Sequence, residues 1–247
     1  MGHWKELTSR IHTVIIYIWV IFGTLIFALL AIAVSLVDRT GDRVHNVAQI
    51  WGRTILWVSL IRVRLCGASR IDPTRSYIFM ANHQSNFDIP TVLGALPFQF
   101  RWLAKAELFR IPIFGRSMRG AGYISIDRSN RESAFRSLKQ AAEIIRNGTS
   151  VLIFPEGTRS SDGRVQPFKK GGFVLAVDAG VPIVPIVIHG TQSIMPKHRL
   201  WIQPGPVKLE VLDLIETAGY TRRTKNELVD RVHRVLSEAR SGGWKRC

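Results

Sequence analysis

Two residues whose side chains could share a proton, His83 and Asp88, lie five positions apart within residues 82–90. Residues 76–81 predict a short buried strand, and Pro90 suits the first turn of a helix, because that turn tolerates a missing N–H. The pair would then lie where the carboxyl end of a strand meets a helix, the end at which open α/β sheets tend to bind ligands. A histidine with a carboxylate in reach can act as a general base, since the carboxylate holds one ring N–H and the other nitrogen takes a proton. Alone, this spacing also fits a buried structural histidine and a helix-capping aspartate.

Two further stretches carry residues that suit an anion. Residues 154–160 follow an apolar strand, and in them Gly157 allows close approach of the backbone while Arg159 offers a planar fork for phosphate. Residues 105–128 carry more basic than acidic side chains. Each stretch alone could be a tight turn with a surface arginine, or a solvated basic face. Their occurrence in one chain with the His83–Asp88 pair favours a functional interpretation.

Several catalytic chemistries lack their sequence patterns. Residues 115–120 have one residue too many for the G-x-S-x-G turn of serine hydrolases. Neither Cys66 nor Cys247 has a local catalytic context, and no H-E-x-x-H or paired C-x-x-C pattern indicates zinc. Without a convincing nucleophile we expect no covalent catalysis, no metal and no cofactor. The chemistry left is a base that activates the substrate's own hydroxyl.

The chain is strongly basic, with 34 Lys and Arg against 18 Asp and Glu and a formal net charge of +16. Such a balance attracts nucleic acid, anionic lipid or a phosphorylated substrate. A membrane-tethered nucleic-acid-binding protein is one alternative, but there is no helix-turn-helix cue, zinc finger or RNP aromatic pattern, so we expect no nucleic acid as partner. A membrane scaffold without catalytic activity is another, against which the intact His83–Asp88 pair argues.

Residues 1–66 predict a membrane-associated pair of helices. Residues 11–37 contain no Lys, Arg, Asp or Glu, and as a helix they would reach about 40 Å, beyond the roughly 30 Å hydrocarbon core of a bilayer. Residues 43–64 have apolar side chains at helical spacing, but only eight uncharged residues separate Arg53 from Arg62, which suits an amphipathic interfacial helix. Basic residues flank the first segment on both sides, so the positive-inside rule gives no orientation. We expect a hairpin in one leaflet, with a single span and an outer N-terminus as the alternative.

Residues 67–247 predict one α/β domain. Strand-like apolar runs alternate with helical patterns: the strands are expected at 98–103, 123–126, 151–154, 181–188 and 207–211, and the helices at 129–146, 171–179 and 228–239. Ser129 and Glu132 have the spacing of a capping box at the start of the first helix. This alternation predicts a mixed, largely parallel sheet flanked by helices.

Four stretches occur in the order of the four motifs of the glycerolipid acyltransferases. They are the His83–Asp88 stretch, residues 105–128 with their final Ile-Asp-Arg, residues 154–160, and residues 181–186. The first and third are specific, and the fourth is weak by itself. Over residues 75–190 the chain most resembles the 1-acyl-sn-glycerol-3-phosphate acyltransferases, also called lysophosphatidic acid acyltransferases. Its N-terminal apolar pair resembles the two-helix membrane motif of bacterial members.

This resemblance implies transfer of an acyl group from a thioester to the sn-2 hydroxyl of lysophosphatidic acid, giving phosphatidic acid without an acyl-enzyme intermediate. His83 would take the hydroxyl proton, while Asp88 would fix its tautomer and steady the imidazolium. The family's substrate-binding positions map onto Lys105, Arg159 and Arg128 for the phosphate and onto Glu156 and Gly157 for the glycerol portion, with Thr158 in the same motif.

The resemblance leaves the donor open between acyl carrier protein and coenzyme A, and it leaves open the acyl-chain length. A related acyltransferase that acts on glycerol 3-phosphate or another lysolipid is the nearest alternative. The lipids lie in the membrane, while the usual thioesters are cytoplasmic. We therefore expect the chain at the cytoplasmic face of the cell (inner) membrane, bound through its N-terminal helices, with anionic membrane lipid as a partner.

Overall fold

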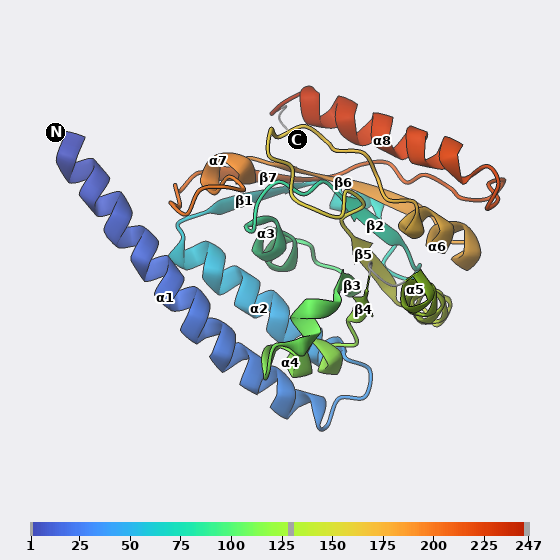
Figure 1. The fold of residues 1–247 in the computed structure, drawn as a ribbon, viewed down its shortest axis with the longest axis horizontal. Coiled ribbons are helices and arrows are strands. Elements are labelled where there is room, and N and C mark those ends of the chain that lie inside the picture. Colours follow the sequence, from blue (N-terminus) through green and yellow to red (C-terminus); the bar gives the residue numbers. More distant parts are fainter. Residues whose placement is uncertain (1, 128–130, 245–247) are drawn as a thin grey trace.

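The computed structural model describes residues 2–127 and 131–244, and its centre is a seven-stranded sheet with the order β1-β7-β6-β2-β5-β3-β4 (Figure 1). Neighbouring strands pair in parallel, while β6 and β7 pair antiparallel. The predicted mixed, largely parallel sheet flanked by helices is confirmed. The strands are β1 (Arg62–Cys66), β2 (Ile78–Ala81), β3 (Phe100–Lys105), β4 (Ile124–Ile126), β5 (Ser150–Ile153), β6 (Ile183–His189) and β7 (Pro206–Val211).

Each face of the sheet carries its own apolar core, because successive side chains of a strand point to opposite faces. Along β2, Phe79 packs into one core, while Ile78 and Met80 pack into the other. The helices on the Phe79 side are α1 (Gly2–Ser35), α2 (Asp42–Val58), α3 (Asp88–Ala95) and α4 (Phe114–Gly120), and those on the other side are α5 (Arg131–Arg146), α6 (Gly171–Ala179) and α8 (Lys225–Ser241) (Figure 1). Short turns of helix complete the described elements at η1 (Ala68–Arg70), η2 (Ala106–Arg110) and α7 (Thr191–Ile194).

The parallel strands determine where the site can form. β2, β5 and β3 are neighbours and run in the same direction, so their carboxyl ends lie at one edge of the sheet. His83 follows β2, residues 154–159 follow β5, and Lys105 ends β3. Three stretches that are far apart in the chain therefore meet at one edge.

The expected helix over residues 43–64 is wrong at its carboxyl end. The helix stops at Val58, and residues 62–66 form β1, which pairs in parallel with β7. Leu60 has a φ of 55°, which a continuing right-handed helix does not allow. Exposure alternates over residues 62–65 of β1, where Arg62 and Arg64 are exposed and Val63 and Leu65 are half-buried, so these residues follow the two-residue period of a strand. Residues 1–66 thus contain two helices and also a strand of the sheet. The capping residue expected at Ser129 lies outside the described residues.

α1 and α2 run antiparallel as a hairpin (Figure 1). Trp51 Nε1 donates to Thr24 Oγ1 (3.1 Å), and Trp19 Nε1 donates to Thr54 Oγ1 (3.3 Å). By length and composition, Leu7–Ser35 within α1 could cross a membrane. Its outer surface is a row of exposed apolar side chains at helical spacing: Ile11, Ile15, Ile18, Phe22 and Ile26.

The contact between α2 and α3 depends on glycine. A Cβ on Gly52 of α2 would lie 2.8 Å from Leu93 Cβ and 3.1 Å from the Gly94 nitrogen, and a Cβ on Gly94 would lie 2.7 Å from Leu56 Cδ1. The two helices therefore approach more closely than side chains there would allow. Because α3 begins at Asp88, this approach sets the position of that carboxylate.

We predict that Gly52→Ala lowers the free energy of unfolding by up to about 2 kcal/mol, because overpacking costs about 1–3 kcal/mol and helix propensity returns only about 1 kcal/mol. Gly171→Ala in α6 is the matched control, since its Cβ would meet Leu138 Cδ1 at an ordinary 3.5 Å. Urea unfolding of the full chain in detergent measures both. A Gly52→Ala protein as stable as Gly171→Ala would contradict this account of the α2–α3 contact.

Candidate active site

His83 and Asp88 form a hydrogen-bonded pair. His83 Nδ1 lies 2.8 Å from Asp88 Oδ2, and the same oxygen accepts the backbone N–H groups of Gln84 (2.6 Å) and Ser85 (2.9 Å). Asp88 is completely buried, whereas the His83 side chain is 15% exposed. A carboxylate that accepts from Nδ1 keeps the hydrogen on that nitrogen, so the opposite nitrogen, Nε2, is left as a proton acceptor.

The plane of the imidazole is fixed by an aromatic neighbour. Phe154 stacks on His83 with ring centroids 4.1 Å apart and planes within 9°, and Trp102 packs against Phe154 at 5.3 Å. The Asp88 hydrogen bond and this stacking together hold the direction of Nε2. Sequence reasoning missed both aromatic contacts. Phe154 directly precedes the Pro-Glu-Gly-Thr-Arg stretch, which was the only available signal.

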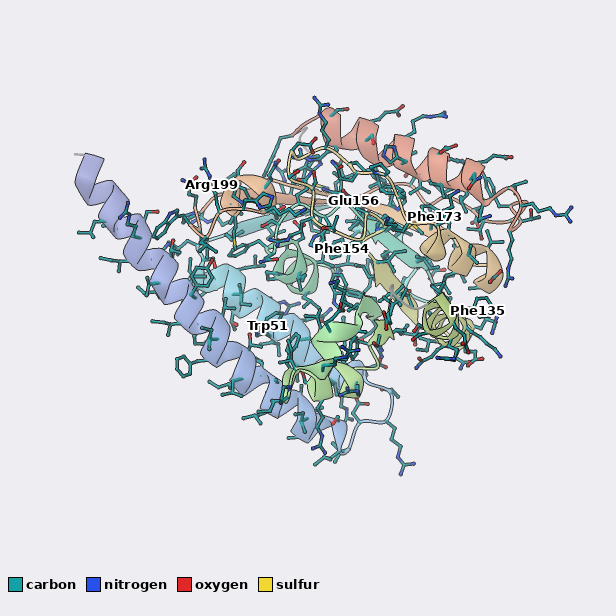
Figure 2. All side chains as sticks on the ribbon, viewed as in Figure 1. Trp51, Phe135, Phe154, Glu156, Phe173 and Arg199 are labelled. Atoms are coloured by element: carbon teal, nitrogen blue, oxygen red, sulfur yellow. The ribbon has the colours of Figure 1, made fainter. Side chains whose placement is uncertain are left out.

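The loops that follow β2 and β5 are joined beneath the histidine. Glu156 Oε1 accepts the backbone N–H of His83 (2.6 Å), and its Oε2 accepts that of Gln166 (2.9 Å). The backbone N–H of Ser160 donates to the His83 carbonyl (2.7 Å). Figure 2 shows Glu156 and Phe154 close together at the centre of the molecule. Glu156 is only 2% exposed. In the structure this predicted substrate-binding residue therefore holds the backbone of the His83 loop in place.

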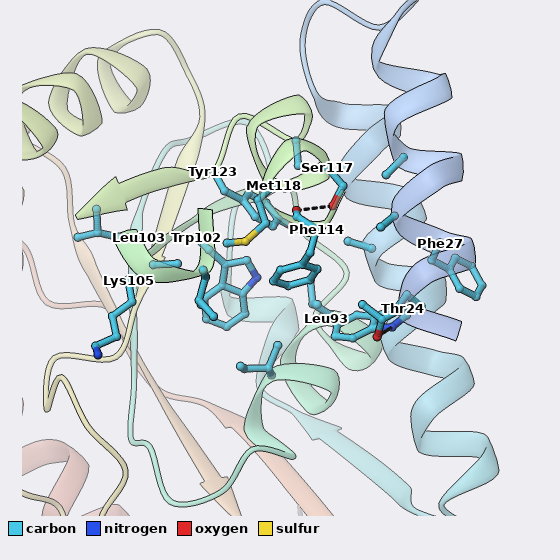
Figure 3. Close-up of a pocket in the computed structure, with 18 of the residues that line it drawn as sticks. Thr24, Phe27, Leu93, Trp102, Leu103, Lys105, Phe114, Ser117, Met118 and Tyr123 are labelled. Carbon is cyan, nitrogen blue, oxygen red and sulfur yellow. Dashed lines mark hydrogen bonds between the residues drawn. The ribbon is translucent and has the colours of Figure 1, made fainter. Parts of the chain in front are cut away.

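A cavity of about 460 Å³ opens beside His83. His83, Lys105, Gly157, Thr158 and Arg159 contribute to its wall. Apolar and small side chains from α1, α2, α3, β3 and α4 form much of the rest, among them Phe27, Ala28, Ala31, Val47, Leu93, Trp102, Phe114 and Met118. Figure 3 shows Lys105 on one side, Thr24 and Phe27 of α1 on the other, and Trp102 and Phe114 between them. The cavity therefore has a cationic region next to the histidine and an apolar region that reaches the N-terminal helices.

The other predicted site residues differ in their surroundings. The Lys105 ammonium lies 3.5 Å from the carboxylate of Glu107, and both side chains are largely exposed. Gly157 has a φ of 77°, a conformation that favours glycine, and its N–H donates to the Phe154 carbonyl (3.1 Å). Arg128 lies outside the described residues. Among the described residues, no group of three or more His, Cys, Asp or Glu side chains could hold a metal ion.

The C-terminal helix also reaches the site, which the sequence did not indicate. Arg240 Nη2 of α8 donates to Gln84 Oε1 (3.1 Å), and Gln84 Nε2 donates to the Gly163 carbonyl (2.6 Å). Burial lowers the pKa of Arg240, and the nearby negative charge of Asp88 opposes that shift. The residue after His83 is thus held by elements from three parts of the chain.

The Acyltransferase family model matches residues 62–189, which is more than half of the chain. The chain belongs to the acyltransferase family. Within this family, it is 34% identical over 221 residues to human 1-acyl-sn-glycerol-3-phosphate acyltransferase alpha, covering 89% of this chain and 77% of the human protein. The match to the 1-acyl-sn-glycerol-3-phosphate acyltransferase of Cocos nucifera is also 34% identical, and it covers 75% of this chain and 60% of that protein.

The acyltransferase fold is shared with a crystal structure. The 1-acyl-sn-glycerophosphate (LPA) acyltransferase PlsC from Thermotoga maritima has a TM-score of 0.82 and 28% identity, and the match covers 98% of this chain and 99% of that one. The chain spans only part of some longer relatives. Its match to the chloroplastic 1-acyl-sn-glycerol-3-phosphate acyltransferase BAT2 of Brassica napus covers 47% of that protein. The resemblance to 1-acyl-sn-glycerol-3-phosphate acyltransferases inferred from the four motifs is confirmed.

We predict a pH dependence of stability from Glu156. Burial raises the pKa of this carboxyl group to about 7, and the charges of Asp88 and Asp162 add to the rise, while its two backbone hydrogen bonds oppose it. Between about pH 4.5 and 7 the folded chain then binds more protons here than the unfolded chain, so stability falls as the pH rises through this window. Relative to that of Glu156→Gln, the free energy of unfolding of the wild type should fall by about 2–3 kcal/mol between pH 4.5 and 8.

Urea unfolding across this pH range measures the difference. Glu238→Gln, on the exposed side of α8, is the control and should track the wild type. If the free energies of unfolding of wild type and Glu156→Gln differed by the same amount at all pH values, a raised pKa of Glu156 would be excluded.

Proposed function

We propose that this chain transfers an acyl group from a thioester to the sn-2 hydroxyl of lysophosphatidic acid, giving phosphatidic acid. The observation that carries the proposal is the single cavity that combines the His83–Asp88 pair, the cations Lys105 and Arg159, and apolar side chains of the N-terminal helices. A lysophospholipid has a phosphate, a free hydroxyl and a hydrocarbon chain, and this cavity has a complementary group for each. The names of the relatives support the same substrate.

In the proposed reaction His83 is the general base. Its Nε2 takes the proton of the acceptor hydroxyl as the oxygen attacks the thioester carbonyl, and a C–O bond forms. The tetrahedral intermediate then collapses with cleavage of the C–S bond, and the imidazolium returns the proton to the leaving thiolate. Asp88 accepts the Nδ1 hydrogen throughout, which keeps Nε2 toward the substrate and stabilises the imidazolium. No acyl-enzyme intermediate is needed.

Lys105 and Arg159 are proposed to bind the acceptor phosphate. Both side chains contribute to the wall of the His83 cavity, and Arg159 can present two parallel N–H donors to phosphate oxygens. Arg128 stays a third candidate from the family motif. Thr158 and Gly157, which contribute to the same wall, are proposed to lie near the glycerol portion.

The proposed donor is an acyl carrier protein or coenzyme A thioester. The basic net charge of +16 suits an acidic carrier protein, and it suits phosphate groups equally. A related activity on glycerol 3-phosphate or another lysolipid is the second candidate, because the His83–Asp88 chemistry would be the same. Purified full chain with each acceptor and each donor, with products identified by mass spectrometry, separates these activities.

The proposed location is the cytoplasmic face of the cell membrane. α1 contacts the rest of the protein at three points along its length. His12 Nε2 lies 2.9 Å from the Val58 carbonyl at the end of α2, Tyr17 Oη donates to the Leu200 carbonyl, and Ser35 lies against Gly120 of α4. A helix that crossed the bilayer would have to leave these contacts, whereas a helix in the plane of the membrane could keep them. We therefore favour an α1–α2 hairpin in one leaflet, with the exposed apolar row of α1 toward the lipid.

We predict that His83→Ala lowers kcat by about 10²–10⁴-fold, the usual contribution of a general base. Asp88→Asn should be comparably severe, because asparagine keeps one acceptor oxygen for the three donors but loses the negative charge that stabilises the imidazolium and holds the hydrogen on Nδ1. The double variant should be little worse than His83→Ala, since the two residues act as a unit. Formation of phosphatidic acid is measured by mass spectrometry, with circular dichroism as a test of folding. A folded His83→Ala protein that retains a tenth of wild-type kcat would refute the assignment.

We predict that Arg159→Ala mainly raises the KM for lysophosphatidic acid, because a phosphate contact is made in both the ground and the transition state. A charge-assisted hydrogen bond is worth roughly 1.5–3 kcal/mol, so kcat/KM should fall about 10–100-fold. Arg159→Lys should restore only part of it, since the fork is lost. Arg164→Ala, an exposed arginine of the same loop that is outside the cavity wall, is the control. Equal KM values for wild type and Arg159→Ala would exclude this role.

A further inference from the structure

A second cavity, of about 770 Å³, lies between the first half of α1 and the loop that connects α7 to β7. From α1 its wall includes Arg10, Thr13, Val14 and Tyr17, and from the loop it includes His198, Arg199, Leu200 and Trp201. Figure 1 shows α7 beside this half of α1, and Figure 2 labels Arg199 there. The lining residues differ entirely from those of the His83 cavity.

The wall is held in place by hydrogen bonds between the loop and the helix. Tyr17 Oη donates to the Leu200 carbonyl (2.8 Å), and the backbone N–H of Ile202 donates to Thr13 Oγ1 (3.2 Å). Thr13 is 2% exposed, so this junction is buried. The loop is therefore a built part of the fold.

The cavity combines positive charge with exposed apolar groups. Arg10, His198 and Arg199 contribute to its wall, and none of the described residues that line it is Asp or Glu. The Arg10 guanidinium lies 5.3 Å from the centre of the Trp201 ring. Leu200 is 71% and Trp201 49% exposed, directly after the basic residues. Tryptophan, tyrosine and basic side chains gather where lipid headgroups meet hydrocarbon.

The loop lies at the same edge of the sheet as the His83 site. It leads into β7, which starts at the edge where the antiparallel neighbour β6 ends, and Ser85 Oγ donates to the Met195 carbonyl (2.8 Å). The exposed apolar row of α1 begins at Ile11, next to Arg10. Val14, which is 53% exposed, lies in the wall of this cavity with Leu200 and Trp201, so the exposed apolar surface of α1 continues to the loop.

We propose that this second cavity binds the phosphate of an anionic membrane phospholipid, with Arg10 and Arg199 as its cationic contacts and Leu200 and Trp201 toward the hydrocarbon. The exposed apolar side chains favour a lipid over free phosphate, because free phosphate has no apolar part to contact them. The charge favours an anionic lipid over a neutral one. This proposal rests on the proposed membrane location and is independent of the acyl-transfer reaction.

The test is native mass spectrometry of the full chain in neutral detergent, titrated with phosphatidylglycerol or phosphatidylcholine. The chain should retain phosphatidylglycerol more strongly, and Arg10→Ala with Arg199→Ala should weaken its binding about 25-fold, since each basic side chain near an anionic surface contributes about fivefold. Arg223→Ala with Arg234→Ala removes the same charge at exposed positions near and on α8 and should change little. The double variant Lys105→Ala, Arg159→Ala is measured as well, because any lipid that it loses relative to wild type was bound in the His83 cavity.

The results separate this site from its alternatives. Equal retention of phosphatidylglycerol by wild type and Arg10→Ala, Arg199→Ala overturns the proposal, as does competition by millimolar inorganic phosphate. If the variant keeps its lipid but loses turnover only with acyl carrier protein as donor, the surface is a carrier-docking site instead. If the double variant does not fold, Arg199→Glu replaces it in the test. This substitution changes an exposed side chain and should give the same loss of lipid binding. A wild-type protein that retains phosphatidylglycerol but transfers no acyl group would count against the proposed function alone.

Discussion

The buried carboxylate of Asp88 is the interaction on which the site depends. One oxygen, Oδ2, accepts the imidazole N–H and two consecutive backbone N–H groups. An ionised carboxylate without such partners would cost several kcal/mol to bury. The three donors offset that cost only when the residues after β2 turn tightly around the start of α3. The same contacts that make the burial possible therefore also orient the imidazole of His83.

The N-terminal helices are part of this arrangement as well as the proposed membrane attachment. α2 packs on α3 through Gly52 and Gly94, so it positions the helix that carries Asp88. α1 and α2 also supply much of the wall of the His83 cavity. A division of the chain at residue 66 separates two sequence patterns, but the cavity is built from both sides of it.

The sequence predicted the elements whose signals are local. Short apolar runs located the strands of the parallel sheet, and parallel pairing then brought His83, Lys105 and Arg159 to one cavity. β1 was missed because its arginines were assigned to a continuing amphipathic helix, and the turn at Leu60 has no sequence signature. The Phe154–His83 stacking, the Arg240–Gln84 contact and the burial of Glu156 join residues 71 to 156 positions apart. Contacts of that kind depend on the register of the whole sheet, which no local pattern contains.

One helix lies between the surface proposed to face the lipid and the His83 cavity. α1 presents Ile11, Ile15, Ile18, Phe22 and Ile26 outward, while Thr24, Phe27, Ala28 and Ala31 of the same helix line the His83 cavity. With the outward row in a leaflet, the proposed lysolipid substrate would need to move only sideways past α1, and its chain would never have to cross water. Encounter then becomes a two-dimensional search within the membrane. The rate of such an enzyme follows the mole fraction of substrate in the lipid surface, and diluting that surface with inert lipid slows it even when the amount of substrate in the vessel is unchanged.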